Sequence, residues 1–352
     1  MKKQILILVF LVLATFANVS KSFGQAIAPT GVAPRPLTLV DDAMKPFAGK
    51  PYNYSAIISP VGGNAYWYAT KNTTFMSGGL RPVGIELPIS ATSIIAGTNY
   101  VSLAAANSTP TTTNITWSTD VLSGVNATTT PLFVVVEYNG PTCTTNNNVK
   151  VIQIVPQNAF TIDLTNMTHL TPTALSYNVP ESQCYAGITS SKWVSGTGVT
   201  NDYGTNTLYF ELVAANFSGK FKPEFKLSGL NSTQTADVAW DIAVNGSYSN
   251  IVATNIASPG SILPVQTVST TLTNTSGGVA IYIKVTVKNN GYEGLTDDKI
   301  TLAVDATDNS GNKDVIPAGT DKAAFAELAF QTLNLRPNVT AGAGVTFITQ
   351  VP

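Results

Sequence analysis

Hydrophobic and polar residues alternate over much of the chain, most regularly between Val279 and Val304. Every second residue from Val279 to Val287 is valine or isoleucine, and alanine, tyrosine, lysine and threonine lie between them. A period of two is typical of a β-strand with one buried and one solvated face. Asn289-Asn290-Gly291 interrupts the pattern, which resumes at Ile300. We therefore predict a hairpin of two sandwich strands joined by a polar loop.

A first β domain is predicted for residues 52–156, because short apolar runs follow one another between Gly- and Asn-rich turns. Pro131–Tyr138 has apolar residues on both faces, which favours a central strand. Six short strands at this spacing predict an Ig-like sandwich. The expected strands are Tyr54–Ile58, Ala65–Thr70, Tyr100–Leu103, Asn114–Ser118, Pro131–Tyr138 and Val149–Val155.

A second, larger β-sandwich is predicted for residues 157–337. Near its end, Asp321–Leu335 fits either a helix capped by Asp321 or a strand with alternating apolar residues. We favour the strand, since the segment ends a β domain. For the tail, residues 338–352, we expect an added edge strand or pairing with the edge of a neighbouring molecule.

The N-terminus has the features of a cleaved signal peptide, residues 1–24. Lys2-Lys3 precedes an apolar core of about a dozen residues, and Ser22-Phe23-Gly24 offers small residues before a cut at Gln25. Residues 25–51 are rich in proline, so we expect an extended leader outside the core, with a short edge strand at Leu37–Val40.

Charge is sparse, at 11% of residues, and the polar load is carried by Thr, Ser and Asn. Signal removal lowers Lys+Arg from 19 to 16 against 20 acids, which leaves a net charge of about −4. This charge argues against nucleic acid as a partner. No later segment could span a membrane as a helix. We expect an exported protein, extracellular, on the cell surface or in the periplasm.

Two cysteines, Cys143 and Cys184, remain in the processed chain. An even pair in an exported chain favours a disulfide. Such a bond would close a loop of about forty residues and contribute roughly 4 kcal/mol in the chain-entropy model. Two separate buried thiols are the alternative.

An acidic and amide-rich turn near the end of the second domain is the candidate metal site. Carboxylates and amides at short intervals around a glycine can surround Ca²⁺ with oxygen ligands. The alternative is a polar turn whose side chains satisfy local backbone groups. No cofactor is required under either interpretation. The candidate ligands are Asp305, Asp308, Asn309, Asn312 and Asp314.

Tyr66-Trp67-Tyr68 offers flat rings that could stack on a sugar. On a strand, Trp67 faces away from both tyrosines, so at least one of the two sets lies in the core. Buried tryptophan is the commoner arrangement in a sandwich. Exposed and buried interpretations both stay open.

Catalytic machinery is not evident. His169 is the single histidine, which excludes sites with several histidines, and no nucleophile elbow accompanies it. Acids such as Glu211 or Asp241 could serve a glycosidase, but nothing singles out a pair. We therefore expect a protein that is not an enzyme.

Two sets of motifs resemble families of exported proteins from Bacteroidota. The order Tyr66-Trp67-Tyr68, Asn114–Trp117, Phe133–Val136, Cys143 and Val149–Val155 resembles a PKD-like, Ig-like module of surface proteins. Residues Phe160 to about Pro337, with Tyr203–Phe210, Ala214–Gly219, Phe225–Leu230 and Tyr292–Leu295, resemble an uncharacterised family of exported surface proteins. Some members of that family are encoded near gliding-motility adhesins and type IX secretion components.

The resemblance implies tandem sandwiches at the cell envelope and assigns no active-site residues. Our functional hypothesis is a non-enzymatic surface protein, structural or associated with adhesins, that acts through contacts with other surface proteins. The alternative is a carbohydrate-binding module, with glycans as ligands. Gliding motility and adhesion are the processes that the resemblance implies.

Overall fold

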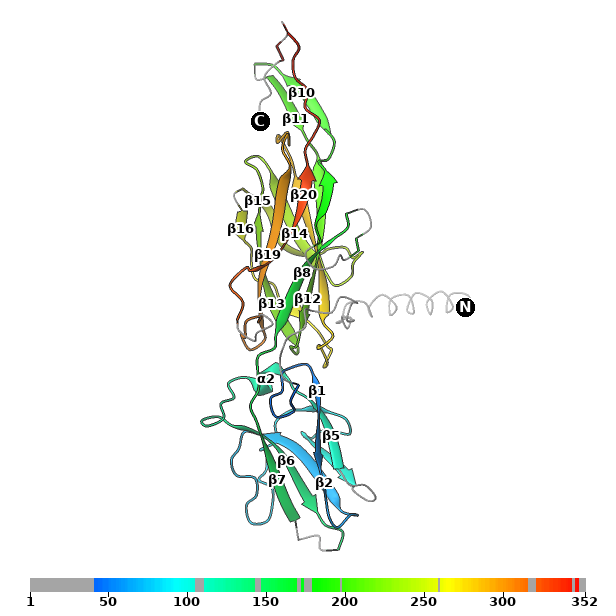
Figure 1. Ribbon diagram of the computed structural model, residues 1–352, viewed down its shortest axis with the longest axis vertical. Helices are drawn as coiled ribbons and strands as arrows, with labels where there is room; N and C mark the ends of the chain where they lie inside the picture. The colour runs from blue at the N-terminus through cyan, green and yellow to red at the C-terminus, as the bar shows by residue number, and fades with distance from the viewer. Residues whose placement is uncertain are drawn as a thin grey trace, which may run out of the picture.

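The computed structural model describes residues 41–104, 111–142, 147–169, 172–173, 179–196, 198–258, 260–315, 321–343 and 346–347. Their regular structure is almost entirely β, with one short helix, α2 (Thr119–Leu122), capped by the Ser118 side chain. Figure 1 shows an elongated molecule in which two β-sandwiches lie end to end. The prediction of an all-β protein with tandem sandwiches is therefore confirmed.

The first sandwich is built from a three-stranded and a four-stranded sheet. Their strand orders are β1-β5-β3 and β4-β2-β6-β7, and every pairing is antiparallel. β6 is central, as the apolar residues on both of its faces predict. The strands are β1 (Pro51–Ala56), β2 (Asn64–Thr70), β3 (Ser90–Ala91), β4 (Tyr100–Ala104), β5 (Thr111–Thr116), β6 (Leu132–Asn139) and β7 (Asn147–Ile154).

The second sandwich packs a five-stranded sheet, β15-β14-β18-β12-β8, on a six-stranded sheet, β16-β13-β19-β20-β9, whose strand β13 also pairs with β17. A separate hairpin, β10-β11, projects at the far end of the molecule (Figure 1). The strands are β8 (Thr161–Met167), β9 (Glu181–Cys184), β10 (Ser190–Val194), β11 (Gly198–Asp202), β12 (Thr205–Ala215), β13 (Lys220–Ser228), β14 (Thr235–Asp241), β15 (Asn250–Ala257), β16 (Gly260–Ile262), β17 (Val268–Ser269), β18 (Val279–Lys288), β19 (Asp298–Asp308) and β20 (Glu327–Asn334).

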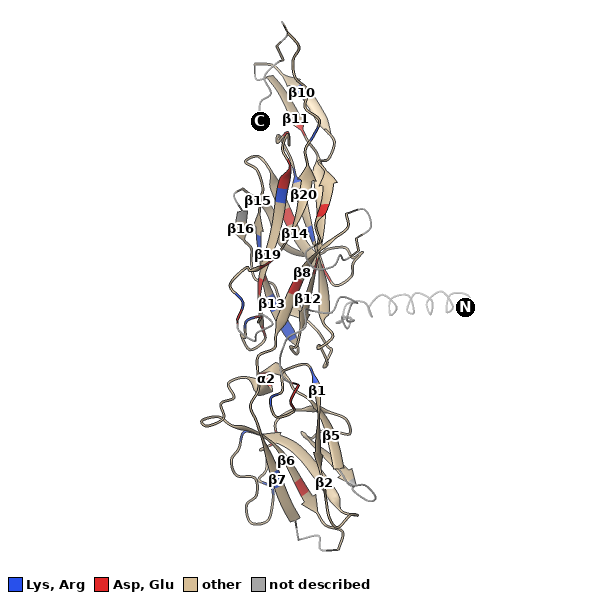
Figure 2. Ribbon diagram, in the orientation of Figure 1, with Lys and Arg blue, Asp and Glu red and all other residues tan. Residues whose placement is uncertain are grey.

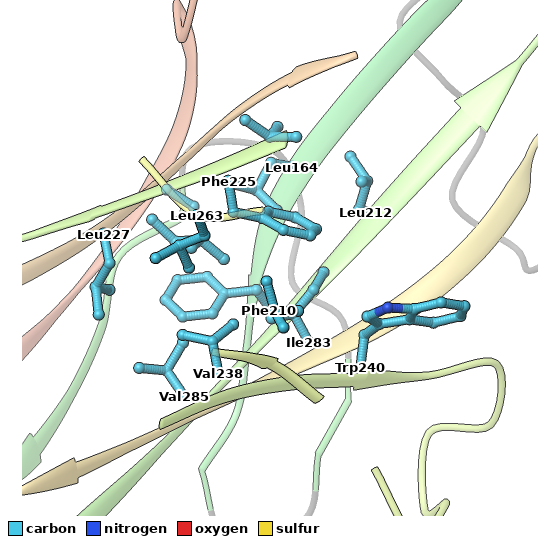
Figure 3. Close-up of a cluster of buried hydrophobic side chains, with 14 of the residues drawn as sticks. Leu164, Phe210, Leu212, Phe225, Leu227, Val238, Trp240, Leu263, Ile283 and Val285 are labelled. Carbon is cyan, nitrogen blue, oxygen red and sulfur yellow. The ribbon is translucent and has the colours of Figure 1, made fainter. Parts of the chain in front are cut away.

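Each sandwich has its own hydrophobic core. Trp67, Trp117 and Leu132 are fully buried in the first core. In the second core, Phe210 and Phe225 lie between the two sheets, surrounded by leucine, valine and isoleucine side chains (Figure 3). Alternate residues of each strand supply these side chains, because successive residues point to opposite faces of a sheet.

The regular alternation that predicted two strands is confirmed, but the predicted hairpin is wrong. β18 belongs to the five-stranded sheet and β19 to the six-stranded sheet, so the loop between them crosses the sandwich. All alternate residues from Val279 to Val287 are buried. The opposite face is only partly solvated, because Ala280 and Tyr282 are also buried, next to Val213 and Met167. Periodicity identifies a strand's buried face and leaves its pairing partner open.

The prediction of a leader outside the core is wrong for residues 46–49, which are buried. Phe47 is buried in the first core and contacts Tyr52 edge-on at 5.9 Å between ring centres. The backbone carbonyls of Met44 and Pro46 accept hydrogen bonds from the N–H groups of Val155 and Gln157. The signal peptide and the predicted strand Leu37–Val40 lie outside the described residues.

The ambiguous segment near the end is a strand, β20, as favoured, and it lies between β19 and β9. In the tail, residues 338–343 and 346–347 form no strand within the described part of the molecule. Its predicted pairing with a neighbouring molecule stays a prediction.

Candidate functional site

The junction between the sandwiches is held by a glycine in a conformation that favours glycine. Gly49 has φ +74°, and a Cβ there would overlap the Thr275 side chain and the Phe217 carbonyl oxygen. Its N–H donates to Trp117 O at 3.0 Å, and its carbonyl accepts from the N–H groups of Thr275 and Ser276 at 2.9 and 3.2 Å. One residue therefore links the cores of both sandwiches through backbone hydrogen bonds.

Further hydrogen bonds cross the same junction. The Thr119 N–H, at the start of α2, donates to Ser218 Oγ at 2.8 Å, and the Thr119 hydroxyl reaches Ser218 O at 3.3 Å. The Asn309 amide donates to Asp120 at 2.6 Å. A polar cavity of about 180 Å³ remains between them, and the Asn216 amide in its wall donates to Ala159 O. Backbone and side-chain hydrogen bonds therefore join the two sandwiches at several points.

The candidate calcium ligands form a hydrogen-bonded turn. The Asp308 carboxylate is buried and accepts from the N–H groups of Ser310 and Asn312, both at 2.9 Å, and from the Asn312 amide at 2.8 Å. The Asp305 carboxylate accepts from Ala306 N–H. These contacts match the polar-turn alternative. Within the described residues, no three His, Cys, Asp or Glu side chains gather in a metal-binding group.

Asp314, the last candidate ligand, belongs to a buried ionic cluster. Lys322 Nζ lies 3.3 Å from Asp314 and 2.8 Å from Glu327, and all three side chains are at least nine-tenths buried. Burial raises the pKa of Asp314, and the Lys322 ammonium opposes that rise. Glu327 Oε1 also accepts the Leu164 N–H of β8 at 3.0 Å. The cluster therefore links β20 to the opposite sheet.

Two of the three predicted stacking aromatics cannot stack on a ligand. Trp67 and Tyr68 are both 0% exposed, and Tyr66 is half-buried. The Arg81 guanidinium, from the loop between β2 and β3, lies 5.0 Å from the Tyr68 ring centre and 5.7 Å from that of Tyr66. The chain's own cation therefore occupies the position that a ligand would take, and the stacking interpretation is wrong for Trp67 and Tyr68.

The exposed tryptophan is Trp193, on the projecting β10-β11 hairpin. Its side chain is 62% exposed, and Ile188, before the hairpin, and Val194, at the end of β10, are exposed as well. Trp193 lies opposite Val199 on the neighbouring strand. The sequence analysis missed this surface, although a short Ser- and Gly-rich strand pair with one tryptophan is itself a weak signal of an exposed hairpin.

Arg336 fixes the base of that hairpin. Its guanidinium lies between the rings of Tyr185 and Tyr203, 5.2 and 4.7 Å from their centres, and donates to the carbonyls of Ala186 and Tyr203. The Tyr185 hydroxyl donates to Asp298 at 2.6 Å, and burial raises the pKa of Tyr185. The hairpin therefore projects from an anchored base.

The remaining candidate residues have structural contacts. His169 Nδ1 lies 2.7 Å from Glu181 Oε1, which connects the end of β8 to β9. Glu211 is buried on β12, and the Asp241 carboxylate accepts the N–H groups of Ala243 and Tyr248. Glu211 lies within β12, and Asp241 ends β14.

The predicted disulfide stays a prediction. Cys184 ends β9 and is exposed, with no sulfur partner among the described residues, so the alternative of a buried thiol is wrong for this residue. Cys143 lies outside the described residues.

Charged residues are thinly scattered over both sandwiches (Figure 2). None of the described helices has the length and apolar character needed to cross a membrane.

Comparisons with known proteins give structural likenesses only. No protein-family model and no curated protein matches the chain. The N-terminal domain of PorA matches with TM-score 0.24 and 13% identity over 49% of this chain and 96% of that domain. The CupB6 tip adhesin from Pseudomonas aeruginosa matches with TM-score 0.26 and 10% identity over 87% of this chain and 97% of the adhesin.

A further match is AvmM, which catalyses macrocyclization in alchivemycin A biosynthesis, with TM-score 0.23 and 9% identity over 53% of this chain and 93% of AvmM. Pilins and adhesins recur among the matches. With TM-scores this far below 0.5, neither kind of match carries an argument about function.

Proposed function

We propose that the protein is a non-enzymatic, exported component of the cell surface, structural or associated with adhesins, and that it acts through protein–protein contacts. The observation that carries the proposal is the junction at Gly49, where backbone hydrogen bonds join the two sandwiches end to end. The two far ends of the elongated molecule are therefore left exposed for contacts. A stiff spacer with contact surfaces at its ends suits a structural role.

The use of the carboxylates supports this proposal. The Asp308 carboxylate stabilises a turn through its hydrogen bonds. The carboxylates of Asp314 and Glu327 pair with Lys322 in the buried ionic cluster. A hydrolase would instead need two acids facing a common substrate cavity. Exposed apolar side chains at the end of the molecule, such as Trp193, are typical of contact surfaces.

A pull-down from the native cell envelope tests the proposal. The chain carrying an affinity tag should capture a defined set of surface proteins, and protease treatment of intact cells should remove it if it lies on the outer face. Recovery of the chain from the cytosol with its first 24 residues attached would contradict the proposal. Turnover of a polysaccharide by the purified chain would do the same.

Carbohydrate binding is a second candidate function, and exposed Trp193 is the observation that favours it. A flat, exposed indole can stack on a sugar ring. Binding on a glycan array should be lost in Trp193→Ala and kept in Tyr66→Phe, because the Tyr66 ring already contacts Arg81. Equal binding by wild type and Trp193→Ala would exclude this site.

Calcium binding that folding does not require is a separate, minor proposal for the turn at Asp305–Asp314. Binding would require Asp308 to exchange its hydrogen bonds for metal coordination. Millimolar calcium should raise the melting temperature of the wild type and leave that of Asp308→Asn unchanged. Equal melting temperatures with calcium and with a chelator would reject the site.

A further inference from the structure

Most strand edges in the molecule are protected against added strands. β15 is bulged at two places along its pairing with β14, and β16, β17 and β3 have two or three residues each. The free side of β4 is covered by residues 94–98, since Ile95 N–H donates to Tyr100 O and Ile94 bridges to Val101. Bulges, short strands and covered edges are the usual ways of preventing edge-to-edge association.

β7 has none of these protections. It has eight residues, no proline and no bulge, and in the described part of the chain β6 is the one strand bonded to it. Its single charged residue is Lys150. The β10-β11 hairpin also has free edges, but its strands have five residues each and carry Lys192 and Asp202. β7 is therefore the longest unprotected edge.

The chain itself shows that this edge accepts an extended segment. Val155 and Gln157, just past β7, donate their N–H groups to Met44 O and Pro46 O at 2.8 and 3.0 Å. Because residues of one parity point their backbone groups to the same side of a strand, Val149, Val151 and Gln153 present theirs to the same edge. Leader residues 44–46 therefore occupy one end of a longer line of donors and acceptors.

The preceding leader residues turn away from the edge. Lys45 N–H donates to Asp42 O in a turn, and Asp41 pairs with Lys50 at 2.8 Å. Beyond that turn, the seam between β1 and β7 contains a cavity of about 130 Å³ lined by Ala56–Ser59 and by residues of β6 and β7. Ile57 at this seam is 87% exposed.

We propose that this edge of β7 binds residues 345–351 of a second copy of the chain as an added strand. Residues 345–351 read Val-Thr-Phe-Ile-Thr-Gln-Val, without charge, proline or glycine. Such a segment can form a continuous ladder and place Phe347 over the apolar seam. Leader residues 25–40 fit less well, because Pro29, Pro34 and Pro36 lack the N–H groups a ladder needs.

The tail cannot reach β7 of its own chain. The segment after β20 runs toward the end that carries β10 and β11, whereas β7 lies in the other sandwich (Figure 1). From Ala343 to Val351 the chain spans at most about 29 Å. The second sandwich alone is longer, since the eleven residues of β12 extend about 37 Å. Pairing must therefore be between molecules, head to tail. Such a contact does not form a closed dimer and can extend from one molecule to the next in an open assembly.

Four chains that begin at residue 25 test this assembly. The wild type should assemble with rising concentration in analytical ultracentrifugation. A chain ending at residue 343 lacks the donor, and Val151→Pro lacks an outward N–H while its bonds to β6 remain. Each should stay monomeric, and a mixture of the two should give a one-to-one complex and no larger species. Val151→Thr is the matched control and should assemble like the wild type.

A wild type that stays monomeric, or a Val151→Pro chain that assembles equally well, would overturn the proposal. If Val151→Pro fails to fold by circular dichroism, a labelled peptide of residues 343–351 decides instead. It should bind the chain ending at 343 at least about tenfold more tightly than a scrambled peptide, and equal binding would reject the site.

A different result would also reject the proposal. If assembly is lost when residues 25–40 are removed but is kept when the tail is removed, the leader and not the tail binds at the edge of β7. The inference deepens the proposed surface function. A monomeric chain that still captures envelope proteins would refute only self-assembly, and an assembling chain found in the cytosol would refute only the surface role.

Discussion

The two sandwiches differ in how they treat their outermost strands. In the second, β8 ends the five-stranded sheet, yet all seven of its residues are buried. Glu327 accepts the outward Leu164 N–H at 3.0 Å, and the Gln331 amide donates to Met167 O of β8 and to Tyr209 O of the neighbouring strand β12. The Glu327 side chain of β20 therefore satisfies an outward N–H at the edge of a strand in the opposite sheet. In the first sandwich, the outward groups of β7 have no such cover from the described residues.

This difference shows that a β-sandwich can be closed on one side by side chains instead of a further strand. A closed sandwich is stable alone and takes no partner strand, whereas an open one retains hydrogen-bonding capacity for a partner. The two sandwiches therefore suit different roles. In the second, the edge of β8 is covered by the chain itself, and in the first, the edge of β7 can take an added strand.

The largest expected effects test whether the two cores contribute equally to stability. If they do, the sandwiches differ only in their edge strands. Trp67→Ala in the first core and Phe225→Ala in the second should each lower the free energy of unfolding by about 3–5 kcal/mol, because both side chains are fully buried. Denaturant unfolding measures both. Trp193→Ala is the control, with a change within about 0.5 kcal/mol, since its ring is exposed. A large loss for Trp193→Ala would show that the hairpin packs against the body.

The second prediction removes the cation of the buried ionic cluster in the second sandwich. Lys322→Ala leaves the buried Asp314 carboxylate without its ammonium partner and should cost about 3–5 kcal/mol at neutral pH. Lys192→Ala, on the exposed hairpin, should change stability by less than about 0.5 kcal/mol. Hydrogen exchange at Leu164 should also accelerate in Lys322→Ala, because Lys322 holds Glu327, the acceptor for that N–H.

The pH dependence of this loss has a definite sign. Burial raises the pKa of Asp314 in the folded state, so the folded chain binds this proton at higher pH than the unfolded chain does. Stability from this group therefore increases as pH falls through the folded-state pKa toward the ordinary carboxyl value. Removal of Lys322 raises that pKa further, so the deficit of Lys322→Ala should be largest at neutral pH and shrink on acidification. A deficit that is constant with pH would contradict this account.

The third prediction disturbs the junction between the two sandwiches. Gly49→Ala forces a Cβ onto Thr275 and Phe217 at φ +74° and should cost of order 1–3 kcal/mol. Gly97→Ala is the matched control, because Gly97 has φ +78° but no neighbour within 4 Å of its Cβ position. Any excess cost of Gly49→Ala over the control therefore reports the junction contact. Small-angle scattering should show a wider range of shapes for Gly49→Ala alone.

The sequence predicted the strands well and the contacts between them poorly. Alternation placed β2, β6 and β18 to within one or two residues, because the buried face of a strand repeats with period two. The same pattern could not tell that β18 and β19 enter different sheets. Pairing depends on residues far apart in the chain, such as Glu211 opposite Tyr282 on neighbouring strands.

The partners of the candidate site residues could not be predicted, for the same reason. Tyr66-Trp67-Tyr68 has the composition of a stacking site, but Arg81 from a later loop covers the tyrosine rings. Asp314 resembles a calcium ligand by spacing, yet Lys322, eight residues further on, pairs with it. Residue types in one stretch show which interactions can form, and the fold determines which partners they meet.

The smallest expected effect concerns the bulged edge strand β15. Asp237 on β14 accepts the Asn255 N–H of β15 at 2.8 Å and pairs with Lys288 at 2.7 Å. Burial favours a higher pKa for Asp237, but Lys288 and the Asn255 N–H outweigh it, and the pKa lies below its ordinary value. Asp237→Asn should therefore cost about 0.2–1 kcal/mol at neutral pH, as exposed pairs do.

The sign of this effect is opposite to that of Asp314. A lowered folded-state pKa gives stability that is present above the ordinary carboxyl value and is lost as pH falls through the folded-state pKa. The difference between wild type and Asp237→Asn should therefore disappear in acid and diminish in high salt. Thermal unfolding at several pH values measures it. A salt-independent loss of several kcal/mol would contradict the account of Asp237 and Lys288 as a partly exposed ion pair.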